Sequence, residues 1–196
     1  MDIQDVRDAN LESKHHIEEL RVEWSNDFGA SRNAMHERHV LEQLRPRRNL
    51  KKLTVASYGG SEFPSWMKDP SFPIMTHLIL KDGKRCKSLP ALGQLSSLKV
   101  LHIEGLNGVS SIDEEFYGGI AKPFPSLEYL KFEEMAEWEY WFCPDAINEG
   151  ELFPCLRELT IRGCRKLGKQ LPWWNLTLLN VQIWEFLFQD LHLSVK

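Results

Sequence analysis

The amino-acid sequence predicts an α/β solenoid in which short parallel strands stack side by side into one curved sheet. The main observation is an apolar ladder, apolar-x-x-apolar-x-apolar, that recurs at irregular intervals of roughly 20 to 33 residues. A second observation is that the last two apolar positions of each copy alternate with polar residues. Six copies are clear and a seventh is weaker: Ile17-Leu20-Val22, Leu50-Leu53-Val55, Met75-Leu78-Leu80, Leu98-Leu101-Ile103, Leu127-Leu130-Phe132, Leu156-Leu159-Ile161 and Leu176-Leu179-Val181.

This alternation indicates one strand in each repeat. A period of two places apolar side chains on one face of a strand and polar side chains on the other. A single strand of this length cannot bury its apolar face, whereas stacked parallel copies share a continuous core. We therefore predict a leucine-rich-repeat solenoid, with a curved parallel sheet on its concave side and with loops and short helical turns on its convex side.

The segments between the ladders support repeated turns. Pro125 and Pro154 each precede the first ladder leucine by two residues. Proline lacks an amide donor and fixes its own dihedral angle, so it is expected between strands or at the start of one. After the strand of one repeat, Leu106 and Val109 supply the apolar residues that turn the chain back, and Cys164 occupies the place where such repeats carry Asn or Cys.

We expect one domain over residues 1–196, with about six to seven irregular repeats. Short helices are predicted over residues 2–14 and 34–45, and the first strand near Glu19 to Trp24. The longest insertion, from Glu133 to Glu151, contains the aromatic residues Trp138, Tyr140, Trp141 and Phe142. The tail over 182–196 diverges from the ladder and is not a capping repeat with a polar outer face. Either this tail serves as the cap or the chain is a fragment of a longer protein, and we favour the fragment.

Composition narrows the possible functions. The formal net charge of −4 argues against a nucleic-acid-binding protein, which normally has a basic face. The basic run Arg45-Pro46-Arg47-Arg48 is expected to be a solvated loop. No stretch is apolar enough for a membrane span and the acidic start is no signal peptide, so we expect a cytoplasmic or nuclear protein. The four cysteines form no C-x-x-C pair, which predicts reduced structural thiols and no zinc site.

Two motifs invite a catalytic interpretation, and both are weak. His36-Glu37-Arg38-His39 resembles the H-E-x-x-H metalloprotease motif, but the second histidine falls one residue early, so we expect a solvated helix face. The carboxylates of Asp113-Glu114-Glu115 are consecutive, which favours a solvated loop. We therefore expect no catalytic residues, no cofactor-binding residues and no metal ligands, and we predict that the protein is not an enzyme.

The polar face of the predicted sheet is the candidate binding surface, since concave solenoid surfaces are the usual binding sites of this architecture. Its outward positions form two rows. Glu104 and Glu133 should be lateral neighbours in the second row, and the resulting acidic spot would be flanked by Lys81 and Arg162. The candidate partner-binding residues are Arg21, Thr54, Ile79, His102, Lys131 and Thr160 in the first row, and Glu23, Lys81, Glu104, Glu133 and Arg162, together with the small Ala56, in the second.

Several segments also carry a family resemblance. Asn49–Val55, Tyr58–Trp66 and Ser88–Lys99, together with shorter matches over 8–11, 20–24 and 40–46, resemble the leucine-rich-repeat region of plant intracellular nucleotide-binding disease-resistance proteins of the coiled-coil class. The Ser88–Lys99 segment is the most specific of these matches. Such proteins carry a nucleotide-binding switch, but the phosphate-loop motif G-x-x-x-x-G-K-[ST] is missing from this sequence, so the chain lacks the nucleotide-binding domain.

The resemblance implies a non-catalytic recognition module of a plant immune receptor. Such a module would act in defence by binding a pathogen protein or its host target, and in autoinhibition by contacting the receptor's own nucleotide-binding domain. The alternatives are a truncated receptor fragment or pseudogene product without independent function, an extracellular repeat protein, and a repeat-type adaptor for ubiquitin transfer. An extracellular repeat protein would need a secretory signal, which the sequence does not show. An adaptor would need an F-box before the repeats, and the segment there is too short for one.

Overall fold

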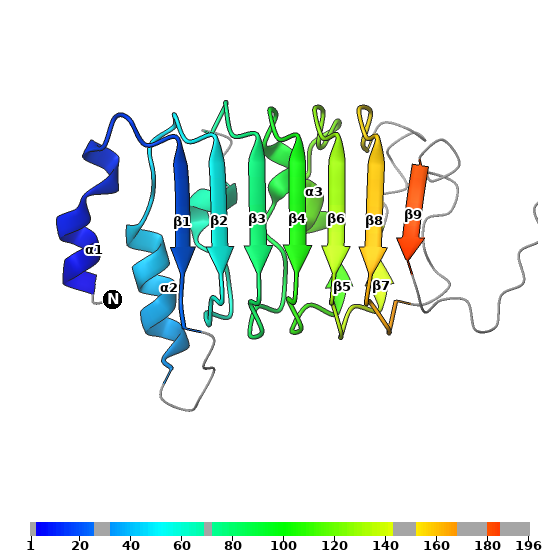
Figure 1. Ribbon diagram of the computed structural model, residues 1–196, viewed down its shortest axis with the longest axis horizontal. Coiled ribbons are helices and arrows are strands. Elements are labelled where there is room, and N and C mark those ends of the chain that lie inside the picture. Colours follow the sequence, from blue (N-terminus) through cyan, green and yellow to red (C-terminus); the bar gives the residue numbers. More distant parts are fainter. Residues whose placement is uncertain (1–2, 26–31, 69–71, 143–151, 168–179, 185–196) are drawn as a thin grey trace, which may run out of the picture.

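The structure is a computed structural model that describes residues 3–25, 32–68, 72–142, 152–167 and 180–184. Its main feature is a sheet of seven parallel strands that lie side by side in chain order (Figure 1). The fold class predicted from the sequence is therefore confirmed. The strands are β1 (Glu19–Glu23), β2 (Lys52–Ala56), β3 (His77–Lys81), β4 (Val100–Glu104), β6 (Tyr129–Glu133), β8 (Glu158–Arg162) and β9 (Asn180–Trp184).

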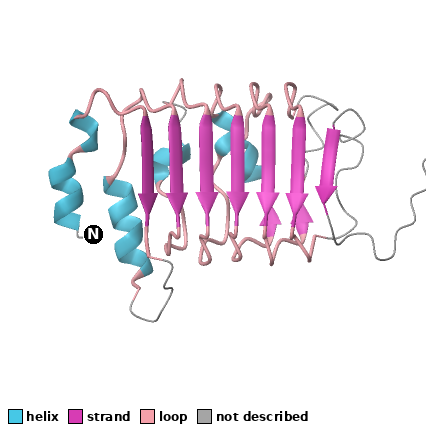
Figure 2. Cartoon of the chain, viewed as in Figure 1, coloured by secondary structure: helices cyan, strands magenta, loops and turns pink. Residues whose placement is uncertain are grey.

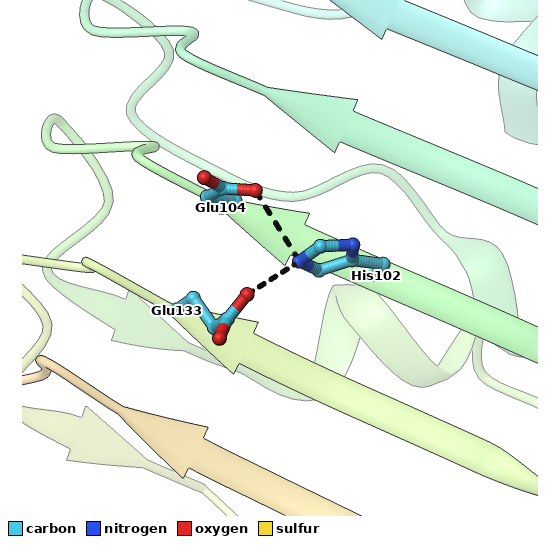
Figure 3. Close-up of side chains that lie close together, drawn as sticks. All are labelled: His102, Glu104 and Glu133. Carbon is cyan, nitrogen blue, oxygen red and sulfur yellow. Dashed lines mark hydrogen bonds and ion pairs between the residues drawn. The ribbon is translucent and has the colours of Figure 1, made fainter.

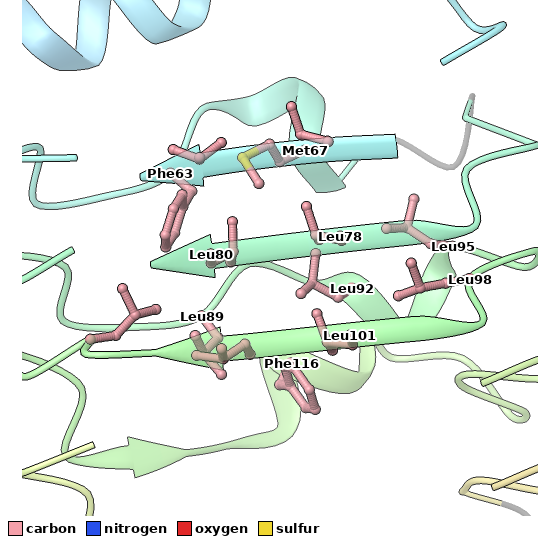
Figure 4. Close-up of a cluster of buried hydrophobic side chains, with 14 of the residues drawn as sticks. Phe63, Met67, Leu78, Leu80, Leu89, Leu92, Leu95, Leu98, Leu101 and Phe116 are labelled. Atoms are coloured by element: carbon pink, nitrogen blue, oxygen red, sulfur yellow. The ribbon is translucent and has the colours of Figure 1, made fainter. Parts of the chain in front are cut away.

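The ladder residues form the core beneath this sheet. The second ladder position of each repeat is paired laterally with the same position of its neighbours, as Leu78 is with Leu101. From β2 to β8 these side chains are almost fully buried, whereas Leu20 of β1 is partly buried. Apolar residues from the returning segments, such as Leu89, Leu92 and Phe116, pack on this core (Figure 4). Burial of a leucine side chain contributes about 1.5–3 kcal/mol, so each added repeat stabilises its neighbours.

Short helices and a second sheet cover the inner side of the seven-stranded sheet, whose other side is open (Figures 1 and 2). They comprise the 3₁₀ turns η2 (Ser65–Lys68) and η3 (Leu92–Gln94), the helix α3 (Glu114–Tyr117), and the two-stranded sheet of β5 (Ser111–Ile112) and β7 (Tyr140–Trp141). The expectation of a solvated loop at Asp113-Glu114-Glu115 is wrong in part. The three residues are exposed, but Asp113 caps α3 by accepting a hydrogen bond from the backbone N–H of Glu115 at 3.2 Å.

The aromatic residues of the long insertion divide between core and surface. Trp138 and Trp141 are buried against Phe132, and the Trp141 Nε1–H donates to the Tyr117 hydroxyl at 2.7 Å. Tyr140 and Phe142 are exposed. The insertion therefore extends the core through its tryptophans; its remaining residues, 143–151, lie outside the described part of the chain.

Two helices lie at the amino-terminal end of the solenoid, one before β1 and one between β1 and β2. The segment predicted as one helix over 2–14 is α1 (Ile3–Ala9) followed by η1 (Leu11–Ser13), because Asn10 adopts a left-handed conformation with φ of 40°. The helix α2 (Ala34–Gln43) begins after Asn33, whose side chain accepts hydrogen bonds from two backbone N–H groups of the first turn.

The seventh repeat begins later than the sequence suggested. Val181 pairs with Leu159 and Ile183 pairs with Ile161, so the ladder of β9 is shifted by two residues from the predicted Leu179 and Val181. Leu176 and Leu179 themselves lie outside the described residues. The strand also includes Gln182–Trp184, which were predicted to belong to the divergent tail; residues 185–196 lie outside the described part of the chain.

Candidate functional site

The open face of the seven-stranded sheet displays the residues that the sequence placed in its two polar rows. Lateral register joins Arg21, Thr54, Ile79, His102, Lys131 and Thr160 in one row. The second row contains Glu23, Ala56, Lys81, Glu104, Glu133 and Arg162. Ala56 is only 3% exposed and contributes almost no accessible surface, contrary to its expected outward position.

A third row on this face was missed. It contains the residue that starts each strand, just before the second ladder leucine: Glu19, Lys52, His77, Val100, Tyr129 and Glu158. The period of two that placed the other rows extends to these positions, so the signal was present in the sequence. It was obscured because Val100 and Tyr129 are apolar and were not expected on a polar face.

His102 links the first row to the second. Its Nε2 lies 3.0 Å from Glu133 Oε2 and 3.4 Å from Glu104 Oε2 (Figure 3). Because an ionised carboxylate can only accept a hydrogen bond, Nε2 carries the proton and donates it to Glu133. Glu104 and Glu133 are register partners on β4 and β6, as the sequence predicted.

Two lysines change the character of the predicted acidic spot. Lys81 Nζ lies 2.7 Å from Glu104, and Lys131 Nζ lies 2.9 Å from Glu133. The two carboxylates are therefore matched by two ammonium groups, and the repulsion expected between them is offset. The spot is a charge-balanced network, and the prediction that it is acidic is wrong.

Burial and hydrogen bonds together determine the protonation of this network. Burial first, and then the charge of Lys81, lower the pKa of His102 below its ordinary value of 6.5, although the hydrogen bond to Glu133 acts in the opposite direction. Burial raises the pKa of Glu133, but the hydrogen bonds from Lys131 and His102 outweigh it, and the pKa is lowered overall. At neutral pH His102 is uncharged and Glu133 is ionised.

The same three side chains also have the composition of a metal site. One ligand atom from each of His102, Glu104 and Glu133 lies within 4.8 Å of the others. A divalent cation bound there would have to displace the ammonium groups of Lys81 and Lys131, each of which already neutralises one carboxylate. The network is therefore better suited to ordering the open face than to holding a metal.

Charges on the open face of β1 to β8 balance. The five cationic residues are Lys52, Arg21, Lys131, Lys81 and Arg162, and the five carboxylates are Glu19, Glu158, Glu23, Glu104 and Glu133. Several of these charges pair with one another, such as Lys52 with Glu19 at 2.5 Å and Arg21 with Glu23 at 2.8 Å. A balanced face does not attract a polyanion, which argues against a nucleic-acid partner for this surface.

A less polar region lies in the middle of the face. His77, Val100 and Tyr129 are lateral neighbours in the third row, and Ile79 lies in the adjacent row of β3; we call these four residues the central patch. Tyr129 is 42% exposed. Burial, and then the charge of Lys52, lower the pKa of His77, so this imidazole is uncharged at neutral pH. Ion pairs lie beside the patch: Lys52 with Glu19 on β2 and β1, and Lys81 with Glu104 and Lys131 with Glu133 toward the ends of β3, β4 and β6.

The motif His36-Glu37-Arg38-His39 is not part of this surface. It lies on α2, and Glu37 is 5% exposed, so the expectation of a solvated helix face is wrong for that residue. Its carboxylate accepts hydrogen bonds from Arg32 and from the backbone N–H of Gly59, at 2.7 Å for the latter. Glu37 is a structural residue that joins α2 to the loop after β2.

Comparison with known proteins places the fold in a family. A family model described as R13L1/DRL21 LRRs, that is, leucine-rich repeats, matches residues 1–106, just over half of the chain. The chain belongs to this family. The R13L1/DRL21 repeats matched here include β1 to β4 and both amino-terminal helices. No solved structure gave a significant match to the chain.

Related plant proteins agree with this assignment. The chain is 36% identical over 198 residues to disease resistance RPP13-like protein 1 of Arabidopsis thaliana. The match covers 94% of the chain and 19% of the relative. It is 32% identical over 163 residues to disease resistance protein RGA4 of Solanum bulbocastanum, covering 80% of the chain and 16% of the relative. Disease resistance protein RGA2 of the same species is 28% identical over 169 residues, with 82% and 17% covered.

These relatives confirm that the chain is a leucine-rich-repeat region of the plant disease-resistance type, as the resemblance implied. The chain spans less than a fifth of the length of these relatives. Within the described residues, no helix has the length and the apolar character that crossing a membrane would need.

Proposed function

We propose that this R13L1/DRL21 repeat region is the protein-recognition module of a plant immune receptor and that its open face binds a protein, either a pathogen protein or its host target. The observation that carries the proposal is the central patch of His77, Ile79, Val100 and Tyr129 within a charge-balanced rim. Protein interfaces combine an aromatic or aliphatic centre with a polar rim that excludes water from it.

The rim is ordered before any partner binds. Lys81 is held by Glu104, Lys131 by Glu133, and His102 bridges the two strands. Side chains that are already fixed lose less conformational entropy on binding, so more of the contact energy remains available for affinity. The pairs also fix the register in which a partner with complementary charges would bind.

A recognition role fits the chemistry of this face better than catalysis does. The carboxylates of Glu104 and Glu133 are each held by a lysine, so neither is available as a general base. His102 donates its Nε2 proton to Glu133 and is fixed by that bond. We therefore propose that the module acts by binding alone.

Site-specific photo-cross-linking tests the proposal. The photoreactive residue p-benzoylphenylalanine replaces Tyr129 in one variant of the chain and Tyr140 in the control. Tyr140 is 56% exposed but lies in the two-stranded sheet of β5 and β7, away from the open face. Both variants are irradiated in plant extract with and without infection, and excess unlabelled chain serves as competitor.

The proposal predicts one protein cross-linked at position 129, displaced by the competitor and missing from the control at position 140. Mass spectrometry identifies the cross-linked protein. If this protein is the nucleotide-binding part of the same receptor, the open face acts in autoinhibition. Equal cross-linking at both positions, or none that the competitor displaces, would refute a specific site on the open face.

A further inference from the structure

A second candidate site lies at the end of the solenoid where β1 and β2 begin (Figure 1). It is a pocket of about 500 Å³ between the segment before β1 and the segment that joins α2 to β2. Its lining residues are Glu12, His15, Arg45, Pro46, Arg47, Arg48 and Asn49. The volume falls in the range of about 300–1,000 Å³ that is typical of small-molecule sites. None of these residues belongs to the open face.

Hydrogen bonds fasten the two walls of the pocket together. Arg47 Nε donates to the backbone carbonyl of Glu12, and Asn49 Nδ2 donates to the carbonyls of His15 at 2.9 Å and Ile17 at 3.1 Å. Below them, the backbone N–H of Lys51 donates to the Glu18 carbonyl at 2.7 Å. The pocket is therefore formed by the folded chain and needs little rearrangement to accept a ligand.

The lining carries an excess of positive charge. Arg45, Arg47 and Arg48 lie within four consecutive residues and line one concavity, whereas Glu12 is its one carboxylate. All three arginines are exposed. Like charges this close repel one another, and a bound anion would relieve that repulsion. The planar guanidinium group also matches the geometry of phosphate oxygens, with two parallel hydrogen bonds.

Asn49 helps to hold the two walls of the pocket together. Among the buried side-chain polar atoms of the described residues, its Oδ1 is the one that has no hydrogen-bond partner. The amide cannot be turned to relieve this, because its Nδ2 donates to two carbonyls.

We propose that this pocket binds a small phosphate-bearing molecule. The arginines hold the phosphate. The pocket favours a compact ligand over an acidic protein segment because its cations line a concavity and are not spread along a strand or helix. This site is independent of the recognition proposed for the open face, and either assignment can fail without the other.

Isothermal titration calorimetry of the full chain at low salt tests the site, with inorganic tripolyphosphate as the probe. The test variant is Arg45→Gln with Arg48→Gln, which keeps Arg47 and its bond to the Glu12 carbonyl. The matched control is Arg157→Gln with Arg165→Gln, which removes two exposed arginines at the other end of the solenoid. Thermal melting shows that each variant is folded, and Arg48→Gln alone serves if the double variant is not.

The proposal predicts that the test variant binds tripolyphosphate at least tenfold more weakly than the wild type and that the control binds it equally well. For Arg48→Gln alone a loss of at least threefold is expected. The proposal is overturned if the wild type does not bind, if the control loses as much affinity, or if hexaglutamate binds as tightly as tripolyphosphate.

Discussion

Glu37 on α2 accepts a hydrogen bond at 2.7 Å from the backbone N–H of Gly59, twenty-two residues away in the loop after β2. The same carboxylate binds the guanidinium group of Arg32, which also donates to the backbone carbonyl of Ser57 at 2.7 Å. Arg85 of the next repeat donates to the carbonyl of Arg32 at 2.9 Å. The Arg32–Glu37 ion pair and the backbone carbonyl of Arg32 therefore join α2 to the segments that follow β2 and β3.

Glu37→Ala should lower the free energy of unfolding by about 3–5 kcal/mol, because it leaves the largely buried Arg32 without its anionic partner. Glu62→Ala is the matched control: it removes an exposed ion pair with Arg38 and should cost less than about 1 kcal/mol. Urea unfolding followed by circular dichroism measures both values. Equal losses in the two variants would show that the Glu37 cluster is not a structural clamp.

Acidification should destabilise the chain between neutral pH and pH 5.5, partly through His102. Its pKa is lowered in the folded protein, so below 6.5 the unfolded chain takes up a proton more readily than the folded one. The stabilising contribution is present above that pH and is lost as the pH falls. Burial, and then the charges of Lys81 and Lys131, lower the pKa of His102, and Glu133 opposes them.

Thermal melting of the wild type and of His102→Gln across this pH range measures the effect. Glutamine can still donate to Glu133 but does not titrate, so its melting temperature should fall less on acidification. His77 also has a lowered pKa and should leave a residual pH dependence in the variant. The direction assigned to the pKa of His102 is wrong if the melting temperature of the variant falls as much on acidification as that of the wild type. It is also wrong if acidification raises the melting temperature of the wild type above its value at neutral pH.

Gly93→Ala should destabilise the packing of η3 against α3 by about 1–3 kcal/mol. A Cβ atom at this position would lie 2.3 Å from the backbone carbonyl oxygen of Tyr117 and 2.8 Å from Pro123. Backbone atoms cannot move aside as a flexible side chain can. Ser96→Ala, at an exposed position of the same turn, should change stability by less than about 0.5 kcal/mol. Comparable melting temperatures for the two variants would contradict this close contact.

The cysteines should differ in their reaction with iodoacetamide in the folded chain. Burial raises the pKa of Cys86 to about 12 and that of Cys164 to about 11, and the Cys86 thiol also donates to the Gly60 carbonyl. Cys155 is exposed. Peptide mapping after brief labelling at pH 8 should therefore find Cys155 modified and the two buried thiols largely intact. Rapid modification of Cys86 without unfolding would contradict its position in the core.

The sequence was sufficient to predict the stack of strands because each ladder is local. Apolar residues at alternating positions determine which face each strand buries, and the repetition of the ladder determines that the strands are parallel. Leu53, Leu78 and Leu101 could be assigned to the core without any knowledge of long-range contacts. The shift of β9 was not predictable in this way, since both Leu179-x-Val181 and Val181-x-Ile183 satisfy the same alternation.

The site was predictable only in its placement. Register followed from the repeats, so Glu104 and Glu133 could be expected side by side. That Lys81 and Lys131 neutralise them depends on how long side chains reach across strands, which sequence spacing does not specify. The burial of Glu37 depends in the same way on Arg32 and on the Gly59 backbone, and the arginine pocket depends on two segments more than thirty residues apart.

The central claim, that the open face recognises a protein, is tested most directly by the affinity of the partner cross-linked at position 129. Surface plasmon resonance would compare Tyr129→Ala with Tyr140→Ala, each removing one exposed tyrosine side chain. The account predicts that Tyr129→Ala weakens binding at least tenfold, or about 1.4 kcal/mol, whereas Tyr140→Ala leaves it unchanged. Unchanged affinity for Tyr129→Ala, or an equal loss for both variants, would contradict recognition by the open face.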